Sequence, residues 1–457
     1  MHAGTPAAVN LQLSFARDGH LAEKDEQDRS AAPRSGGLSF GMVVLYIILE
    51  YGRPQQLFPP LAVLHLPALV TGGLLLLLFA SRHVSLAHTE TKLFMVLLGV
   101  MIAHVPVALN NYWAFFTAES MLVTFVAYLG IITFVDSFDR FKTLITIWLA
   151  VNSFNAVYAL FSGPSAIGVH GVGETGVGSF LGEENDFALA VNIALPFAYF
   201  MLLSAPGAIG RFACTLLVAL FVATNVLTFS RAGFIGLTAV AFYCWIRSHR
   251  KVFSLVLLGA LALLVVAIAP HGYWREISSI EAGADDPTGG ERLYLWAGGL
   301  DMFVQHPIVG VGQGNFAHQF RYYEEAIDSP GLHGRSRAGL VAHSVYVTLL
   351  AELGLIGTIV WVAMVSCYVR NTRRVRRAER PIMDTAMSEE LGDALADSRR
   401  DQLYGFSLAA DGSLIAYLVG GIFNTVLYYP SFWLLTAFVI VLRTIAWNAN
   451  DPNPAHD

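Results

Sequence analysis

Arginines and a histidine beside long apolar segments are the residues of this chain best suited to chemistry. Arg231 lies in LTFSRAGFIGL, between two apolar stretches that leave no room for a solvated loop. A charge in such a place is costly unless it is paired or faces a polar cavity. A guanidinium binds phosphate oxygens in bidentate fashion and stays charged at any working pH. We therefore expect Arg231 to bind an anion. The alternative is a side chain that reaches out to the membrane interface.

Further arginines are weaker candidates for the same anion site. Arg292 follows Glu291 at the start of a predicted amphipathic helix, and Arg53 lies in the short loop YGRPQ. The alternative for Arg292 is a surface ion pair with a local carboxylate, and the alternative for Arg53 is an interface anchor. We expect three other arginines of the polar block to lie on a solvated face, namely Arg321, Arg335 and Arg337.

His343 is the best candidate for proton transfer. It stands at the start of an apolar segment, directly after a long polar block, so it can face both outer water and a cleft at membrane level. An imidazole titrates near neutrality and suits general-base work. Tyr346 is expected on the same helical face at i+3. Glu352, roughly on the opposite face, is expected to be a buried structural partner. The alternative for His343 is a helix-start histidine bonded to a neighbour.

No metal site or dinucleotide site is predicted. Asp285 and Asp286 form a lone acidic pair in AGADDPTGG, and no His/Asp/Glu cluster has ligand spacing. The glycines of GVGQGNF do not follow a strand. Nothing indicates nucleic-acid binding, and no cofactor is expected. Cysteines are read as small apolar residues of the spans: Cys214, Cys244 and Cys367.

The elements that position these residues are membrane helices. Of 457 residues, 55% are hydrophobic and only 14% are charged, which excludes an ordinary soluble globule. Stretches of about 17–25 apolar residues cross ~30 Å of hydrocarbon. About twelve are predicted, so the expected fold is an all-α polytopic membrane protein; the first and eighth look short. They cover 38–51, 62–80, 92–110, 120–135, 142–161, 186–203, 211–229, 232–247, 252–270, 341–369, 406–428 and 430–447.

Basic residues predict the orientation. The richest run is RNTRRVRRAER, residues 370–380, and short basic loops favour the cytoplasm. Placing this run inside also places the other basic loops inside, at 82–92, 140–142, 211 and 247–251. A basic run can also bind anionic lipid, but the topology by itself accounts for this one.

The same orientation divides the chain. We expect a disordered cytoplasmic tail at 1–37, spans one to nine at 38–270, a periplasmic loop at 271–340, and spans ten to twelve at 341–447. The last region includes a basic cytoplasmic loop at 370–403, and a cytoplasmic tail follows at 448–457. In the periplasmic loop, GGERLYLWAGGLDMFVQH predicts an amphipathic helix with Leu293, Trp296, Leu300 and Phe303 on one side. Pro307 is expected to end it, and GVGQGNF to form a glycine-rich turn.

Four segments, in this order, resemble the O-antigen ligase and O-antigen polymerase (Wzy-type) superfamily. They are FLGEENDFALAVNIALPFA, TFSRAGFIGL, ERLYLWAGGLDMFVQHPIVGVGQGNF and AHSVYVTLLAELGLIG. The resemblance covers about residues 165–365. Ser344 departs from the pattern, because the family often has Asn there.

The resemblance implies a GT-C-like glycosyltransferase with many membrane spans, in the bacterial inner membrane. Such enzymes take a glycan from undecaprenyl diphosphate at the periplasmic face and join it to an acceptor, without a metal. The family's pyrophosphate-binding arginines correspond to Arg231 and Arg292, and its essential histidine corresponds to His343. Cations on the departing phosphates and a base for the acceptor hydroxyl are what this chemistry needs. Direct displacement would invert the anomeric centre.

Several readings stay open. The acceptor could be the lipid A core, a growing O-antigen or exopolysaccharide glycan, or a protein in the case of a protein O-oligosaccharyltransferase. From another class, the chain could be a transporter or flippase of a lipid-linked saccharide. Such a protein should carry charges along a central cavity and show repeat symmetry. Here the charges gather at the outer face, which favours an enzyme embedded among membrane lipids.

Overall fold

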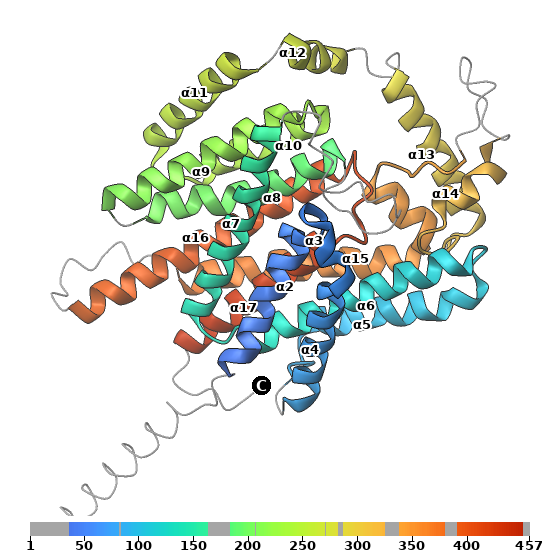
Figure 1. Ribbon diagram of the computed structural model, residues 1–457, viewed down its shortest axis with the longest axis horizontal. Coiled ribbons are helices and arrows are strands. Elements are labelled where there is room, and N and C mark those ends of the chain that lie inside the picture. Colours follow the sequence, from blue (N-terminus) through green and yellow to red (C-terminus); the bar gives the residue numbers. More distant parts are fainter. Residues whose placement is uncertain are drawn as a thin grey trace, which may run out of the picture.

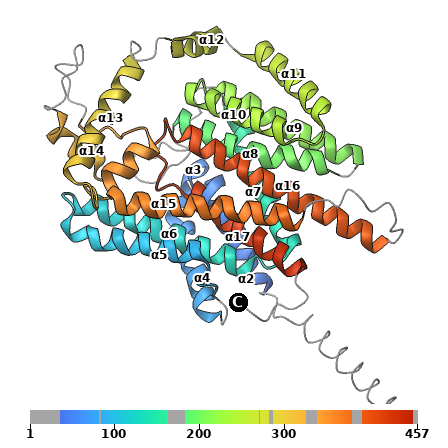
Figure 2. The same cartoon turned by 180° about the vertical axis from the view of Figure 1, so that it is seen from behind.

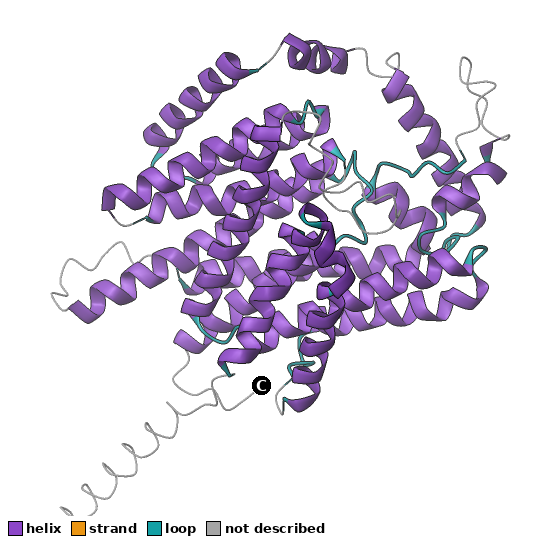
Figure 3. Cartoon of the chain, viewed as in Figure 1, coloured by secondary structure: helices purple, strands orange, loops and turns teal. Residues whose placement is uncertain are grey.

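Helices make up the regular secondary structure throughout the part of the chain that the structure describes (Figure 3). The structure is a computed structural model, and it describes residues 36–81, 84–162, 183–205, 207–269, 271–281, 287–324, 338–379 and 391–450. No strand occurs in these ranges. The all-helical fold class expected from the apolar spans is therefore confirmed for the described residues.

Every predicted span has a helix. The helices are α2 (Gly37–Gly52), α4 (Leu66–Ala80), α5 (Thr89–His104), α6 (Asn111–Phe134), α7 (Phe138–Ser162), α8 (Glu184–Ser204), α9 (Gly207–Leu227), α10 (Arg231–Arg247), α11 (Lys251–Ile268), α15 (Val345–Ala378), α16 (Leu391–Gly420) and α17 (Pro430–Asn450). Ten helical stretches among the described residues are long and apolar enough to cross a membrane, when residues 60–65 are counted with α4 and residues 105–107 with α5. The other two are α2 and α10, with 16 and 17 residues, which are the two spans that looked short.

The remaining helices connect these twelve. They are α3 (Pro54–Leu57), η1 (Pro59–Leu64), η2 (Val105–Val107), α12 (His271–Ser278), α13 (Pro287–Gln305), α14 (Phe316–Gln319) and η5 (Phe320–Tyr322). From α12 to η5 they form the described part of the predicted outer excursion. Figure 1 shows α11 and α12 arching along one edge of the molecule toward α13.

The eleventh span was placed wrongly at its end. It was expected to run to residue 428, but α16 ends at Gly420 and residues 421–429 form turns. The Gly421 carbonyl accepts a hydrogen bond from the Val345 backbone N–H at 2.8 Å, at the start of α15. A Cβ on Gly421 would lie 2.7 Å from the Tyr417 carbonyl oxygen. The helix ends at this close backbone contact, which a hydropathy pattern cannot predict.

The core is built around α8. This helix packs against α16, α9 and α10, and 89% of its apolar window is buried. Such all-round burial suits a helix that is apolar on every face, as ALAVNIALPFAYF is. At the periphery, α4 and α11 each bury only 17% of theirs. Figures 1 and 2 show α11 and α4 at the edges of the molecule from both sides.

The bundle has two chemically different ends. The histidine end holds His343 and the first residues of α8, α10 and α15. Because α8, α10 and α15 all begin there, the basic residues that follow α10 and those at the end of α15 lie at the opposite end. This second end is called the arginine end. It is cross-linked by Glu90, which accepts from the Asn371 amide at 2.7 Å, and by Arg376, which pairs with Asp411 at 2.7 Å.

Candidate functional site

The histidine end is organised where α8 and α10 meet. The Ser230 hydroxyl donates to Asn185 Oδ1 at 2.5 Å and accepts from the Gly233 backbone N–H at 2.8 Å, which makes Ser230 the N-cap of α10. The buried Asn192 amide donates to the Gly233 carbonyl at 3.0 Å. A Cβ on Gly233 would lie 2.6 Å from Ala188 Cβ, so the two helices touch here. The first residue of α10, Arg231, is thereby fixed relative to α8.

Arg231 is held by α12. Its Nε lies 3.1 Å from Glu276 Oε1, and its Nη1 donates to Ser279 Oγ at 2.9 Å. The side chain is 17% exposed. Arg231 is thus paired with a carboxylate, and the alternative of an arginine that simply reaches for the lipid interface does not describe this environment. Arg231 lies at the N-terminus of α10, where the positive end of the helix dipole also favours binding of an anion.

His343 lies outside the helix that it was expected to start. Helix α15 begins at Val345, and His343 has a φ of 46°, in the left-handed region. The expectation that Tyr346 shares a helical face with His343 is therefore wrong, and the Tyr346 hydroxyl instead donates to the Leu418 carbonyl at 2.6 Å. A non-glycine residue in this region is uncommon and is often found at functional sites.

The surroundings of His343 favour its neutral form. Burial lowers the pKa of the half-buried imidazole, Glu183 raises it, Arg292 lowers it and Glu291 raises it, with a lowered pKa as the result. A neutral imidazole is the form that accepts a proton. Since these charges act on one another, Glu183, Arg292 and His343 lie within electrostatic range.

Arg292 belongs to the first turns of α13, where Phe423 lies close. Its guanidinium carbon is 5.7 Å from the centre of the Phe423 ring, in the turn segment 421–429. Helix α13 is tied to the His343 segment by Trp296, whose Nε1 donates to the Ala342 carbonyl at 3.0 Å. The Trp296 bond holds the start of α13 near the His343 segment, which agrees with the electrostatic effect of Arg292 on His343.

The apolar side predicted for α13 is not the side that packs most tightly against the protein. Leu293 and Leu300 are about half exposed, whereas Leu295 and Met302 are buried. The reason is Gly299, where a side chain would collide with Val347 of α15. A small residue at this position lets α13 approach α15, and that contact decides which face is inside. The end of α13 at Gln305, just before Pro307, is as predicted.

Arg53 is buried rather than an interface anchor. Its side chain and backbone are 6% exposed, its φ is 45°, and its Nε donates to the Glu50 carbonyl at 3.3 Å. Arg53 lies within electrostatic range of Tyr429, which is hydrogen-bonded to the side chain of Asp186 at the start of α8. Burial raises the pKa of Tyr429, so its hydroxyl stays protonated and donates to Asp186.

Glu183 joins the two groups of charges. It acts electrostatically on His343 and also on Tyr429. The histidine end therefore gathers Arg53, Arg292 and His343 around the N-terminus of α8, with Arg231 linked to it through Ser230 and Asn185. No role was predicted for Glu183, Asp186 or Glu276. The only signal for the first two was an acidic run, GEEND, at the start of an apolar helix.

The glycine-rich turn and Glu352 form a structural clamp. Gly310, Gly312 and Gly314 all have positive φ, so GVGQGNF forms the predicted turn. Buried Glu352 accepts from the backbone N–H of Gly314 at 2.7 Å and of Phe316 at 2.8 Å. It also accepts from the Tyr428 hydroxyl at 2.7 Å, beside Tyr429. The expectation of a buried structural partner is confirmed for Glu352.

The other predicted positions do not join this site. Arg321 is exposed and donates to its neighbour Tyr322 at 2.8 Å, as expected of a solvated face. Arg335, Arg337, Asp285 and Asp286 lie outside the described residues. Within the described ranges, no group of three or more His, Cys, Asp and Glu residues could hold a metal ion.

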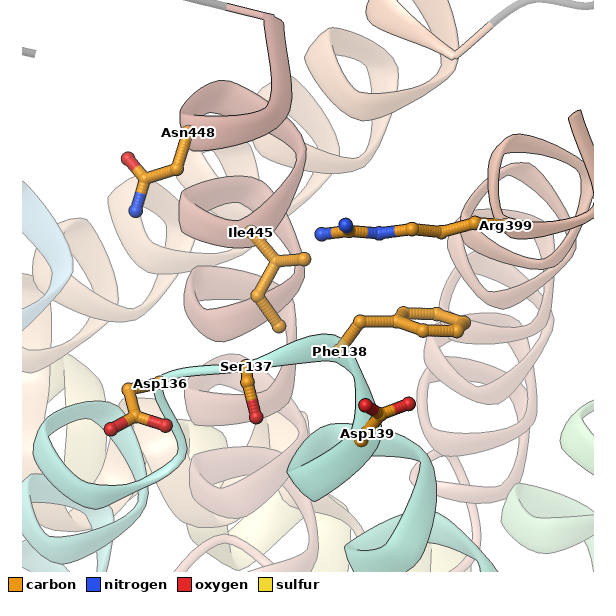
Figure 4. Close-up of a pocket in the computed structure, with 7 residues that line it drawn as sticks. All are labelled: Asp136, Ser137, Phe138, Asp139, Arg399, Ile445 and Asn448. Carbon is orange, nitrogen blue, oxygen red and sulfur yellow. The ribbon is translucent and has the colours of Figure 1, made fainter. Parts of the chain in front are cut away.

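A hollow at the arginine end is not part of the site either. It measures about 390 Å³ and is lined by Asp136, Ser137, Phe138, Asp139, Arg399, Ile445 and Asn448 (Figure 4). Two of its charges have local partners, since Asp136 pairs with Arg140 at 3.0 Å and Arg399 lies over the Phe138 ring at 5.5 Å.

Comparison with known families identifies the region that contains the arginines and the histidine. Residues 216–362 match the family described as O-antigen ligase. The match covers about a third of the chain, so the similarity to O-antigen ligases is shown for this domain alone. This domain runs from α9 into α15 and includes Arg231, Arg292 and His343, while Arg53, Glu183 and Asp186 lie before it. It confirms the resemblance to the O-antigen ligase and polymerase superfamily and supports glycosyl transfer in polysaccharide assembly. No curated protein matches the chain.

Proposed function

We propose that this protein transfers a glycan from undecaprenyl diphosphate to an acceptor hydroxyl at the periplasmic face of the bacterial inner membrane. The observation that carries the proposal is the grouping of His343, Arg292 and Glu183 at one end of a membrane bundle, inside and beside an O-antigen ligase domain. Both termini would then lie in the cytoplasm, together with the arginine end.

The proposed reaction is a direct displacement. His343 removes the proton of the acceptor hydroxyl, and the acceptor oxygen attacks the anomeric carbon. The bond between that carbon and the phosphate oxygen breaks, and its electron pair leaves with the diphosphate. The anomeric centre inverts. A histidine kept neutral by burial suits the first step, and guanidinium groups suit the charge that develops on the leaving group.

Arg231 and Arg292 are proposed to bind the diphosphate, with Arg53 supporting the same end of the bundle. The ion pair of Arg231 with Glu276 affects how the donor would bind in this scheme. Its carboxylate partner, Glu276, occupies the position that a phosphate oxygen would take, so donor binding would exchange one anion for another. The partly exposed position of Glu276 makes that exchange feasible.

The decisive experiment is a transfer assay with purified protein in lipid vesicles. The donor is an undecaprenyl-diphosphate-linked glycan, and lipid A core, a free glycan or a serine-containing protein is supplied in turn as the acceptor. Product with one acceptor supports the proposal and names the acceptor class. Movement of the donor across the vesicle membrane without a new glycosidic bond would instead identify a transporter of lipid-linked saccharide and would refute the enzyme.

A further inference from the structure

A hollow at the end of α15 is bordered by arginines, and none of the described residues that line it is acidic. It measures about 580 Å³. Its lining consists of Val365, Ser366, Val369, Arg370, Arg373, Arg374 and Arg377. The four arginines are all exposed. This hollow lies at the arginine end, away from His343, and takes no part in the proposed reaction.

The arginines continue an apolar stripe of the same helix. Leu355, Ile359 and Val362 are each about half exposed or more, and Arg373 and Arg377 follow at the same helical spacing. With 1.5 Å per residue, Leu355 and Arg373 lie about 27 Å apart along the axis, close to the ~30 Å thickness of bilayer hydrocarbon. If the apolar stripe faces lipid tails, the arginines emerge in the headgroup layer.

Ion pairing distinguishes these arginines from their neighbour. Arg376, one residue before Arg377, pairs with Asp411 at 2.7 Å and donates to the Ser407 carbonyl at 3.3 Å. Among the described residues, Arg373, Arg374 and Arg377 have no carboxylate partner. Orientation of the chain requires only positive charge on this side of the membrane. Orientation does not explain why these guanidinium groups lack carboxylate partners, or why they surround a hollow that also has two valines in its lining.

We propose that this hollow is a binding site for an anionic phospholipid. The headgroup phosphate would lie among Arg370, Arg373 and Arg377, since guanidinium groups bind phosphate oxygens in bidentate fashion. The acyl chains would lie along Val365, Val369 and the apolar stripe of α15. The site does not depend on the proposed glycosyl transfer, because it needs only that α15 crosses a bilayer.

The test compares two double variants that lose the same charge. R373Q/R377Q removes two arginines of the hollow, and R211Q/R250Q removes two exposed arginines at the same end, near the starts of α9 and α11. Purified full-length proteins in a neutral detergent are titrated with phosphatidylglycerol or phosphatidylethanolamine, and bound lipid is counted by native mass spectrometry. The wild type should prefer phosphatidylglycerol. R373Q/R377Q should bind it about tenfold more weakly or worse, and R211Q/R250Q should bind it like the wild type.

Two outcomes would overturn the proposal. Equal binding of phosphatidylglycerol by both double variants would reduce the arginines to orientation signals. Displacement of the lipid by millimolar inorganic phosphate would assign the hollow to a soluble anion. If R373Q/R377Q does not elute as a single species, the single variants R373Q and R377Q are used instead. Each should weaken phosphatidylglycerol binding severalfold, because each removes one guanidinium group that would contact the headgroup phosphate.

Discussion

Arg231 and Glu276 form an ion pair, with 3.1 Å between Nε and Oε1, that ties the start of α10 to α12. The pair connects the apolar segment between α9 and α10 to the polar loop at 271–340, and its two residues are 45 positions apart in the sequence. It also gives the candidate phosphate-binding arginine a partner that an incoming diphosphate must replace. The first prediction follows from that competition.

Arg231→Ala should lower transfer by about 10²-fold or more, because a cation that stabilises the leaving group is gone. Arg231→Lys should recover little, since a point charge does not reproduce the guanidinium fork. Glu276→Gln should have the opposite effect on donor binding and lower the KM for the donor severalfold. Rates are measured in the vesicle assay, with Arg321→Ala as an exposed arginine control. Full activity in Arg231→Ala would remove this residue from the site.

His343→Ala should reduce turnover by about 10²–10⁴-fold, which is the usual contribution of a general base. His343→Gln should be nearly as slow, because an amide does not accept the proton. Donor binding should persist in both variants, since the arginines are intact. Binding is measured with the labelled donor and turnover in the same preparation. Turnover close to the wild type would leave His343 with a structural role only.

The acid limb of the pH–rate profile should report His343. Burial lowers its pKa, so the neutral base persists below the ordinary imidazole range and activity falls only as the pH drops through the lowered value. Glu183 raises this pKa, so Glu183→Gln should move the acid limb to still lower pH. A Glu183→Gln profile that keeps the wild-type acid limb would show that the carboxylate does not act on the base. A chelator such as EDTA should not change the rate, because arginines supply the positive charge.

Glu352→Ala should destabilise the fold without touching the proposed chemistry directly. The variant leaves the backbone N–H groups of Gly314 and Phe316 and the Tyr428 hydroxyl without their acceptor. A buried donor left without its acceptor costs about 1–3 kcal/mol. We expect a clear drop of the apparent Tm in detergent. Glu119→Ala, which removes an exposed carboxylate of α6, should melt like the wild type. Equal melting of the two variants would contradict the clamp.

Orientation is open to cysteine labelling. In a background without the three native cysteines, Ser278→Cys on α12 should react with a membrane-impermeant maleimide in cells whose outer membrane is permeabilised. Ala378→Cys at the end of α15 should react only after the inner membrane is opened. Both positions are exposed, so access to the reagent is set by the membrane. The reverse pattern would place His343 in the cytoplasm and refute a periplasmic site.

The sequence alone determined where the helices form and which residues merit attention. Hydropathy and helix length are local properties, so each of the twelve predicted segments has a helix, and α2 and α10 are the short ones. The turn at GVGQGNF was predictable for the same reason, because its three glycines adopt positive φ whatever the rest of the fold does. Arg231 and His343 could be selected from the sequence alone, because an ionisable side chain beside an apolar segment is costly unless it has a partner or a function.

Tertiary structure decided how those residues are partnered. The Arg231–Glu276 pair, the proximity of Glu183 to His343 and the clamp by Glu352 join residues 36 to 160 positions apart. Helical periodicity placed Leu293 and Leu300 together on one apolar side of α13, but the approach of Gly299 to Val347 buries Leu295 and Met302 instead. Periodicity describes one helix at a time, whereas burial depends on the neighbour that the helix meets.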